Sequence, residues 1–201
     1  MTHEEHDPRT FAAEAAYAQS LFRFALGDRE ASIQALYRSL DALPNHAPAL
    51  LGVGSVEYQR GRSAEGLGHF LSLLELPDGT QDLHEILDRA GQFLIDRRDY
   101  ADGLELYRRA AARFPDVGAL HQGLACCAGH EGQFEEAVTA SYAALALEPE
   151  NQALASDLGW SLLQAGHLEE ARGALERAVR MHPEDELATN NLRCCVERLG
   201  E

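Results

Sequence analysis

The sequence predicts an all-α protein built as a stack of repeated helix pairs, and three observations lead to this. Pro115, Pro149 and Pro183 recur 34 residues apart, and Pro44 fits the same frame if one three-residue insertion follows the second unit. Before these prolines, apolar residues recur at spacings of three and four, as on one face of a helix. Glycine or alanine stands at matching places in each unit, where small side chains let paired helices cross closely. A fixed period of this length is typical of stacked supersecondary units.

The last complete unit, residues 152–185, shows the pattern most fully. It contains two helical stretches separated by Gly166, which we expect to supply the tight turn between them. The pattern is carried by Leu158, Gly159 and Leu162 in the first stretch, by Ala171, Leu175 and Ala178 in the second, and by the closing Pro183.

This pattern resembles the tetratricopeptide repeat (TPR), two antiparallel helices in 34 residues. The resemblance implies a right-handed superhelical solenoid with about five repeats and a C-terminal capping helix. In residue numbers this gives a tail at 1–12, repeats at 13–46, 47–83, 84–117, 118–151 and 152–185, and the cap at 186–201. The second repeat is irregular because Pro77 comes one place early and Pro77–Thr80 lengthens the exit loop. We therefore expect any change of surface chemistry along the stack at that junction.

The composition limits the classes of partner that the protein is expected to bind. The chain has 33 acidic and 17 basic residues and a net charge of −16. Such acidity disfavours nucleic acid, whose phosphates must be neutralised by Lys and Arg. No apolar run approaches the length of about 20 residues that spans a bilayer, which predicts no membrane insertion. Residues 1–10 lack the apolar stretch of a secretory signal, and the four cysteines form two adjacent pairs rather than a disulfide framework. We expect a reduced, cytoplasmic protein.

The family resemblance also implies where a partner binds. In TPR proteins the first helix of each repeat lines a concave groove, and fixed places of the repeat carry the contact residues. Transferred to this chain, the candidate groove residues are Tyr17, Leu21, Phe24, Tyr58, Glu85, Asp88, Gln92, Asp96, Cys126, His130, Trp160, Gln164 and Asn190.

The chemistry of these places predicts the kind of partner. Aromatic residues in a groove commonly anchor a bound segment. Two alternatives stay open: Trp160 could instead fill a gap between repeats, and Tyr17 and Phe24 could be buried beneath residues 1–12. The acidic centre of the groove predicts a peptide or helical segment with apolar anchors and some basic residues. A chaperone tail held by the family's carboxylate clamp is not expected, because the chain has no lysine and Tyr17 and Leu21 stand where the clamp would begin.

Few residues suggest catalysis or metal binding. Cys126 and His130 lie four apart on one predicted helix, so they share a face and could form a thiolate–imidazole pair or half a metal site. No further ligands follow nearby in the sequence, and no phosphate-binding loop or nucleophile elbow is present. His3 and His6 are a second weak metal candidate in a solvated tail. We expect no enzyme activity, no metal and no cofactor.

Three functional hypotheses follow. The first is a non-enzymatic adaptor whose groove holds a segment of another protein. The second is a cytoplasmic chaperone for a secreted protein, such as a secretion-system translocator or needle subunit. The third is a thiol or metal site at Cys126 and His130. Self-association is also open, because residues 186–200 could pack against a second copy.

Overall fold

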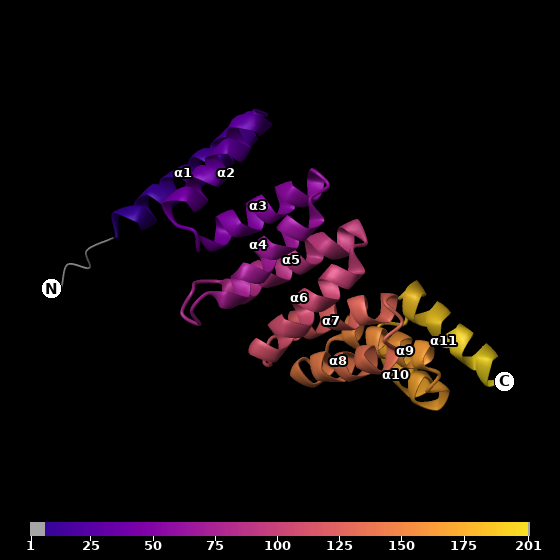
Figure 1. Ribbon diagram of the computed structural model, residues 1–201. Coiled ribbons are helices and arrows are strands. Elements are labelled where there is room, and N and C mark those ends of the chain that lie inside the picture. The colour runs from indigo at the N-terminus through magenta and orange to yellow at the C-terminus, as the bar shows by residue number, and fades with distance from the viewer. Residues whose placement is uncertain (1–6, 201) are drawn as a thin grey trace. The chain divides into compact units, whose positions relative to one another are not determined.

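The computed structural model describes residues 7–200 and confirms the all-α helical-repeat solenoid class (Figure 1). Within that range there are eleven α-helices, one short 3-10 helix and no strand. The helices are α1 (Pro8–Ala25), α2 (Arg29–Ala42), α3 (Ala47–Gln59), α4 (Ser63–Ser72), the 3-10 helix η1 (Leu73–Glu75), α5 (Leu83–Arg97), α6 (Tyr100–Arg113), α7 (Gly118–His130), α8 (Phe134–Leu147), α9 (Gln152–Ala165), α10 (Leu168–Met181) and α11 (Glu186–Leu199). None of these helices has the length and apolar character required to cross a membrane.

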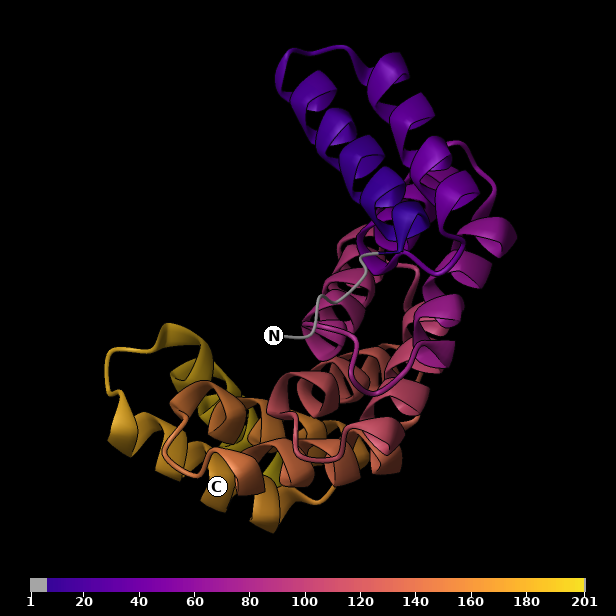
Figure 2. The same cartoon turned by 90° about the vertical axis from the view of Figure 1, so that its left-hand side faces the viewer.

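The chain divides into two compact units, Met1–Phe93 (unit 1) and Leu94–Glu201 (unit 2). In unit 1, α1 packs on α2 and α3 packs on α4; in unit 2, α7 packs on α8, α9 on α10, and α10 on α11. Figure 2 shows this pairing of consecutive helices. The boundary between the units falls inside α5. It therefore lies later in the chain than the Pro77–Thr80 loop, where the sequence predicts a change of surface chemistry.

The first helix starts earlier than the sequence frame suggested. Asp7 is its N-cap, with the Asp7 side chain accepting a hydrogen bond from the Arg9 amide at 3.0 Å, and Pro8 occupies the first helical turn. Residues 8–12, which we expected to be tail, are therefore helical, because an Asp-Pro pair is well suited to begin a helix. His3 and His6 lie outside the described residues.

The core of unit 1 is built where α3 and α4 cross. A side chain at Gly54 would overlap Phe70, and one at Gly66 would overlap Tyr58, so the two glycines make room for the rings. Tyr58 and Phe70 are stacked with centroids 5.6 Å apart, and Phe93 of α5 meets both rings edge-on at 5.8 Å. Edge-on and offset arrangements of this kind stabilise aromatic cores.

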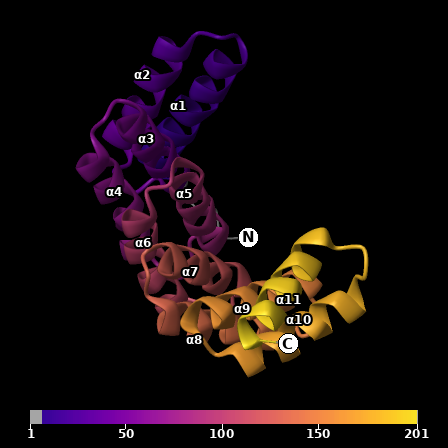
Figure 3. The same ribbon diagram turned by 90° about the vertical axis from the view of Figure 1, so that its right-hand side faces the viewer.

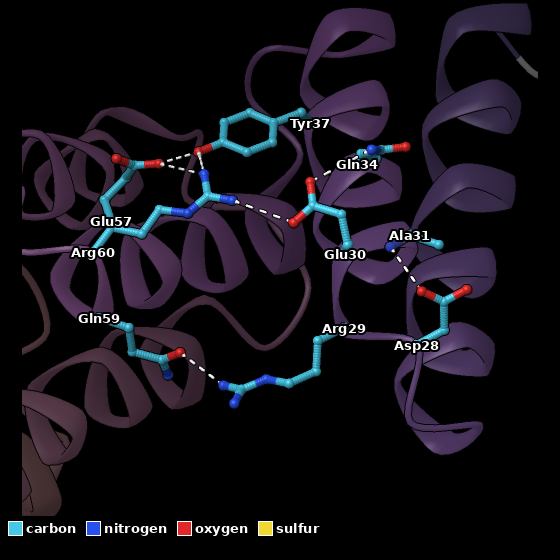
Figure 4. A network of polar contacts seen from close by, with 9 residues as sticks. All are labelled: Asp28, Arg29, Glu30, Ala31, Gln34, Tyr37, Glu57, Gln59 and Arg60. Atoms are coloured by element: carbon cyan, nitrogen blue, oxygen red, sulfur yellow. Dashed lines mark hydrogen bonds and ion pairs between the residues drawn. The ribbon is translucent and has the colours of Figure 1, made fainter.

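A buried carboxylate joins the first two repeats of unit 1 (Figure 4). Glu57 of α3 is only 4% exposed, and it accepts hydrogen bonds from the Tyr37 hydroxyl of α2 and from the guanidinium of Arg62. Arg60 lies 4.0 Å from the same carboxylate and extends the network to Glu30. These donors and cations lower the pKa of Glu57 to about 2, with the Arg62 hydrogen bond as the largest cause. Burial and the Glu57 hydrogen bond raise the pKa of the Tyr37 hydroxyl.

In unit 2, glycines at the helix crossings again leave room for large neighbouring side chains. A side chain at Gly123 would overlap Tyr107, one at Gly159 would overlap Leu175, and one at Gly103 would press on Cys127. Figure 3 shows α11 beside α9 and α10, and these three helices share one core. Cys127 and Cys195 are fully buried within unit 2, where each fills space as a small apolar side chain.

The turns inside the repeats share one backbone conformation. Gly132 and Gly166 have φ of 73° and 86°, in the left-handed region that glycine adopts without strain. Arg98 stands at the equivalent turn between α5 and α6 and has φ of 64°. A non-glycine residue in this conformation is strained, because its Cβ crowds the backbone.

Candidate functional site

Unit 1 contains a groove of about 380 Å³. We call it the unit 1 groove. It is lined mainly by apolar and small polar side chains from α1, α2, α3 and α5: Tyr17, Ser20, Leu21, Phe24, Arg29, Ser32, Ile33, Leu36, Pro48, Leu51, Gly52, Ser55, Val56, Gln59, Arg89 and Phe93. Three candidate residues from the sequence, Tyr17, Leu21 and Phe24, are thus brought together.

Two large apolar side chains of the groove wall are exposed to solvent. Leu21 is 53% exposed and Phe24 is 66% exposed, so the alternative in which Phe24 is buried beneath residues 1–12 is wrong. Tyr17 is half-buried and lies against the ring of His46, with centroids 5.5 Å apart. Exposed large apolar side chains beside a groove are typical of a surface that binds a partner.

The charged residues of the unit 1 groove are both arginines. Arg29 donates a hydrogen bond to Gln59 at 3.2 Å (Figure 4), and Arg89 makes no hydrogen bond or ion pair within residues 7–200. The acids Glu85, Asp88 and Asp96 of α5 do not line this groove, and neither does Gln92. The groove therefore offers cations where the sequence led us to expect an acidic centre.

Tyr58 lies in the core of unit 1 and does not line the groove. It is 1% exposed, with its ring stacked on Phe70 and its edge against Phe93. The expectation that Tyr58 lines the groove is wrong, because its position on α3 points the ring into the crossing with α4, where Gly66 leaves room for it.

In unit 2 the first helices present a second surface. Four residues of α9 that are not buried lie on one face of the helix at helical spacing: Ala153, Asp157, Trp160 and Gln164. We call this the α9 stripe. Trp160 is 45% exposed, so nearly half of its side chain is open to solvent and it is not fully buried between repeats. The neighbouring helices α7 and α11 contact α9 and carry the candidate residues Cys126 and His130, and Asn190, all at least partly exposed.

Asp157 is the unusual group of this surface. Its carboxylate accepts a hydrogen bond from the Gln122 amide of α7 at 2.8 Å, which ties α9 to α7. Burial raises the pKa of Asp157, and the Gln122 hydrogen bond offsets this only in part. Within residues 7–200 no cation is paired with it. The sequence frame missed Asp157, although its place one helical turn before Trp160 could have indicated it.

The geometry gives little support to chemistry at Cys126 and His130. The pKa of the Cys126 thiol is raised, first by burial and then by the negative charge of Asp157, which disfavours the reactive thiolate. His130 stacks on Tyr100, with ring centroids 3.8 Å apart. Among the described residues no group of three or more His, Cys, Asp and Glu is placed to hold a metal ion.

A second hollow of about 540 Å³ lies between α8, α9 and α10 of unit 2. The Tyr142 hydroxyl at its edge donates a hydrogen bond to Glu170 at 3.1 Å. None of the sequence-predicted site residues lies in this hollow.

Similarity to known proteins agrees with this architecture. The chain is 26% identical over 191 residues to the protein CTR9 homolog of Arabidopsis thaliana, covering 93% of this chain but only 14% of that protein's length. The crystal structure of MamA superposes with a TM-score of 0.63 at 17% identity, covering 86% of this chain and 93% of MamA. YrrB, described as a TPR protein with an unusual peptide-binding site, gives a TM-score of 0.63 at 18% identity, covering 92% of this chain and 97% of YrrB.

Family models match directly in sequence. One tetratricopeptide repeat model matches residues 17–79 and 89–154, which is more than half of the chain. A second tetratricopeptide repeat model matches residues 130–190. With the paired helices and the glycine crossings described above, the chain belongs to the tetratricopeptide repeat family.

Proposed function

We propose that this protein is a non-enzymatic interaction scaffold whose unit 1 groove binds a segment of another protein. The single observation that carries the proposal is an apolar groove with Leu21 and Phe24 standing more than half exposed at its wall. TPR proteins are generally non-catalytic interaction modules, and the structurally similar YrrB is described as having a peptide-binding site.

The size and chemistry of the groove suit a short segment with an apolar anchor. A volume of about 380 Å³ is enough for one or two large side chains of a partner. Covering Leu21 and Phe24 would remove apolar surface from water, at about 25 cal/mol per Å². Arg29 and Arg89 favour an acidic residue next to the anchor, since opposite charges across an interface guide orientation and speed association.

A peptide library tests this proposal on the full chain. Dodecapeptides are selected from a random displayed library, synthesised with a fluorescent label and titrated against the wild-type protein by anisotropy. Leu21→Ser and Phe24→Ser should each weaken binding about 10-fold or more, because anchoring contacts in a groove carry most of the binding energy.

Phe11→Ser is the matched control. Phe11 is also an exposed aromatic residue of α1, but it does not line the groove. Peptides that bind all three variants as tightly as wild type would place the binding surface elsewhere, and a library that yields no enriched peptide would also count against the proposal.

A further inference from the structure

The α9 stripe brings together two groups that suit a positive charge. Asp157 and Trp160 are three residues apart on α9, so their side chains are neighbours on one face of the helix. Trp160 is the only tryptophan of the chain and is 45% exposed. Gln122 reaches Asp157 from α7 and holds the carboxylate in place.

The carboxylate of Asp157 is incompletely compensated within the chain. A partly buried carboxylate is costly unless it is paired with a cation or receives several hydrogen bonds. Asp157 receives one hydrogen bond, from a neutral amide, and no cation of the described chain pairs with it. A cation from a ligand would supply the opposite charge that Asp157 lacks within the chain.

Trp160 complements the same cation. A guanidinium or ammonium over an indole face is attracted by the ring quadrupole, and tryptophan is the best aromatic partner for this contact. An arginine fits better than a lysine, because its planar guanidinium can stack on the ring while directing N–H groups to a carboxylate. A metal ion is a poorer occupant, since no group of three or more ligating side chains is found at this place among residues 7–200.

We infer that the α9 stripe of unit 2 binds an arginine side chain of a protein partner, held between the Asp157 carboxylate and the Trp160 ring. The inference rests on the proposed function only in taking a protein segment as the partner. It adds a specificity element in unit 2, with a charge preference opposite to that of the unit 1 groove.

Matched peptides test the inference with the full-length protein. An array of acetylated, amidated heptapeptides carries a central arginine flanked by varied apolar residues other than tryptophan and tyrosine. A second array carries citrulline, which keeps the shape of arginine but has no charge. Dissociation constants come from labelled peptides, and the emission of Trp160 reports contact directly because no other tryptophan is present.

Arginine peptides should bind wild-type protein about 10-fold more tightly than their citrulline counterparts and should change Trp160 emission. Asp157→Asn, which can still accept the Gln122 hydrogen bond, should reduce that ratio to nearly one. Trp160→Leu should weaken arginine peptides several-fold. Glu150→Gln, which removes an exposed negative charge from the α8–α9 loop, should leave the ratio unchanged and serves as the charge-matched control.

Equal binding of the two arrays to wild-type protein would overturn the inference, as would an arginine preference that persists in Asp157→Asn. An array without any binding peptide would also overturn it. If Leu21→Ser still weakens the library-selected peptides in these cases, only the arginine site fails. If Leu21→Ser has no effect either, the proposed function fails with it.

Discussion

Glu57 in unit 1 and Asp157 in unit 2 are both shielded carboxylates on first helices, yet their surroundings are opposite. Glu57 is held by Tyr37 and Arg62 with Arg60 nearby, and its pKa falls to about 2. Asp157 has one neutral donor, Gln122, and its pKa is raised. One acid is satisfied by its own chain, and the other is not.

The donors around each carboxylate distinguish an acid that holds the fold together from one that is available to a partner. The Glu57 network lies between α2 and α3 and uses its donors to fasten one repeat to the next (Figure 4). Asp157 lies on an exposed stripe beside Trp160, where a partner can reach it. A raised pKa on a partly buried acid marks a candidate functional site, whereas an ion-pair network such as that of Glu57 shifts a pKa for structural reasons.

The largest effect on stability is expected from Tyr58, which lies in the core of unit 1. Tyr58→Ala should lower the free energy of unfolding by about 3–5 kcal/mol, because it removes a buried ring and leaves a cavity. Chemical denaturation followed by circular dichroism measures this. Leu21→Ala on the exposed groove wall should cost less than about 1 kcal/mol. Similar costs for both variants would show that the groove wall is part of the core.

Removing the charge of Glu57 should have the next largest effect. Glu57→Gln should destabilise the protein by about 1–3 kcal/mol at neutral pH, since the Tyr37 hydroxyl and the Arg62 guanidinium lose a buried, charged acceptor. The folded-state pKa of about 2 lies below the ordinary value of 4.5, so this stabilisation is present above about 4.5 and is lost as the pH falls toward 2. Thermal melts across this range should show the loss in wild type and a smaller slope in Glu57→Gln.

Asp157→Asn should act in the opposite direction. Because the folded-state pKa of Asp157 is raised, the folded protein binds more protons than the unfolded chain, and ionisation of Asp157 opposes folding as the pH rises. The variant should therefore have a higher melting temperature than wild type at neutral pH, and the gain should vanish on acidification. A lower melting temperature at neutral pH would mean that Asp157 is structural after all.

The smallest effect concerns the turn after α5. Arg98→Gly should stabilise the protein by up to about 1 kcal/mol, because glycine relieves the left-handed strain but gains freedom in the unfolded chain. Gly132→Arg, at the equivalent turn of the next repeat, should destabilise it. Urea denaturation of the two variants checks that the effects have opposite signs.

The helix pairs and their crossings were predictable because their signals are local. Closing prolines, turn glycines and small residues at crossings each act on neighbours within one repeat, as Gly159 and Leu175 illustrate. The start of α1 was missed only because the Asp7-Pro8 signal lies upstream of the repeat frame.

The site was less predictable because it depends on faces and on distant neighbours. A shift of one place on a helix turns a side chain by about 100°, which explains why Phe93 and Arg89, rather than the neighbouring Gln92 and Asp88, line the unit 1 groove. The state of Asp157 depends on Gln122, which lies 35 residues earlier in the chain. No pattern within one repeat encodes that contact.

The left-handed turn residues have a practical consequence. Gly27, Gly61, Arg98, Gly132, Gly166 and Gly200 all share this backbone conformation and follow the repeat frame. Cutting the chain at two of these residues and rejoining it would bring together ends that already have matching backbone angles. A shortened or lengthened protein made in this way should keep its remaining helix crossings, so the arginine site and the unit 1 groove could be separated or multiplied by editing whole repeats.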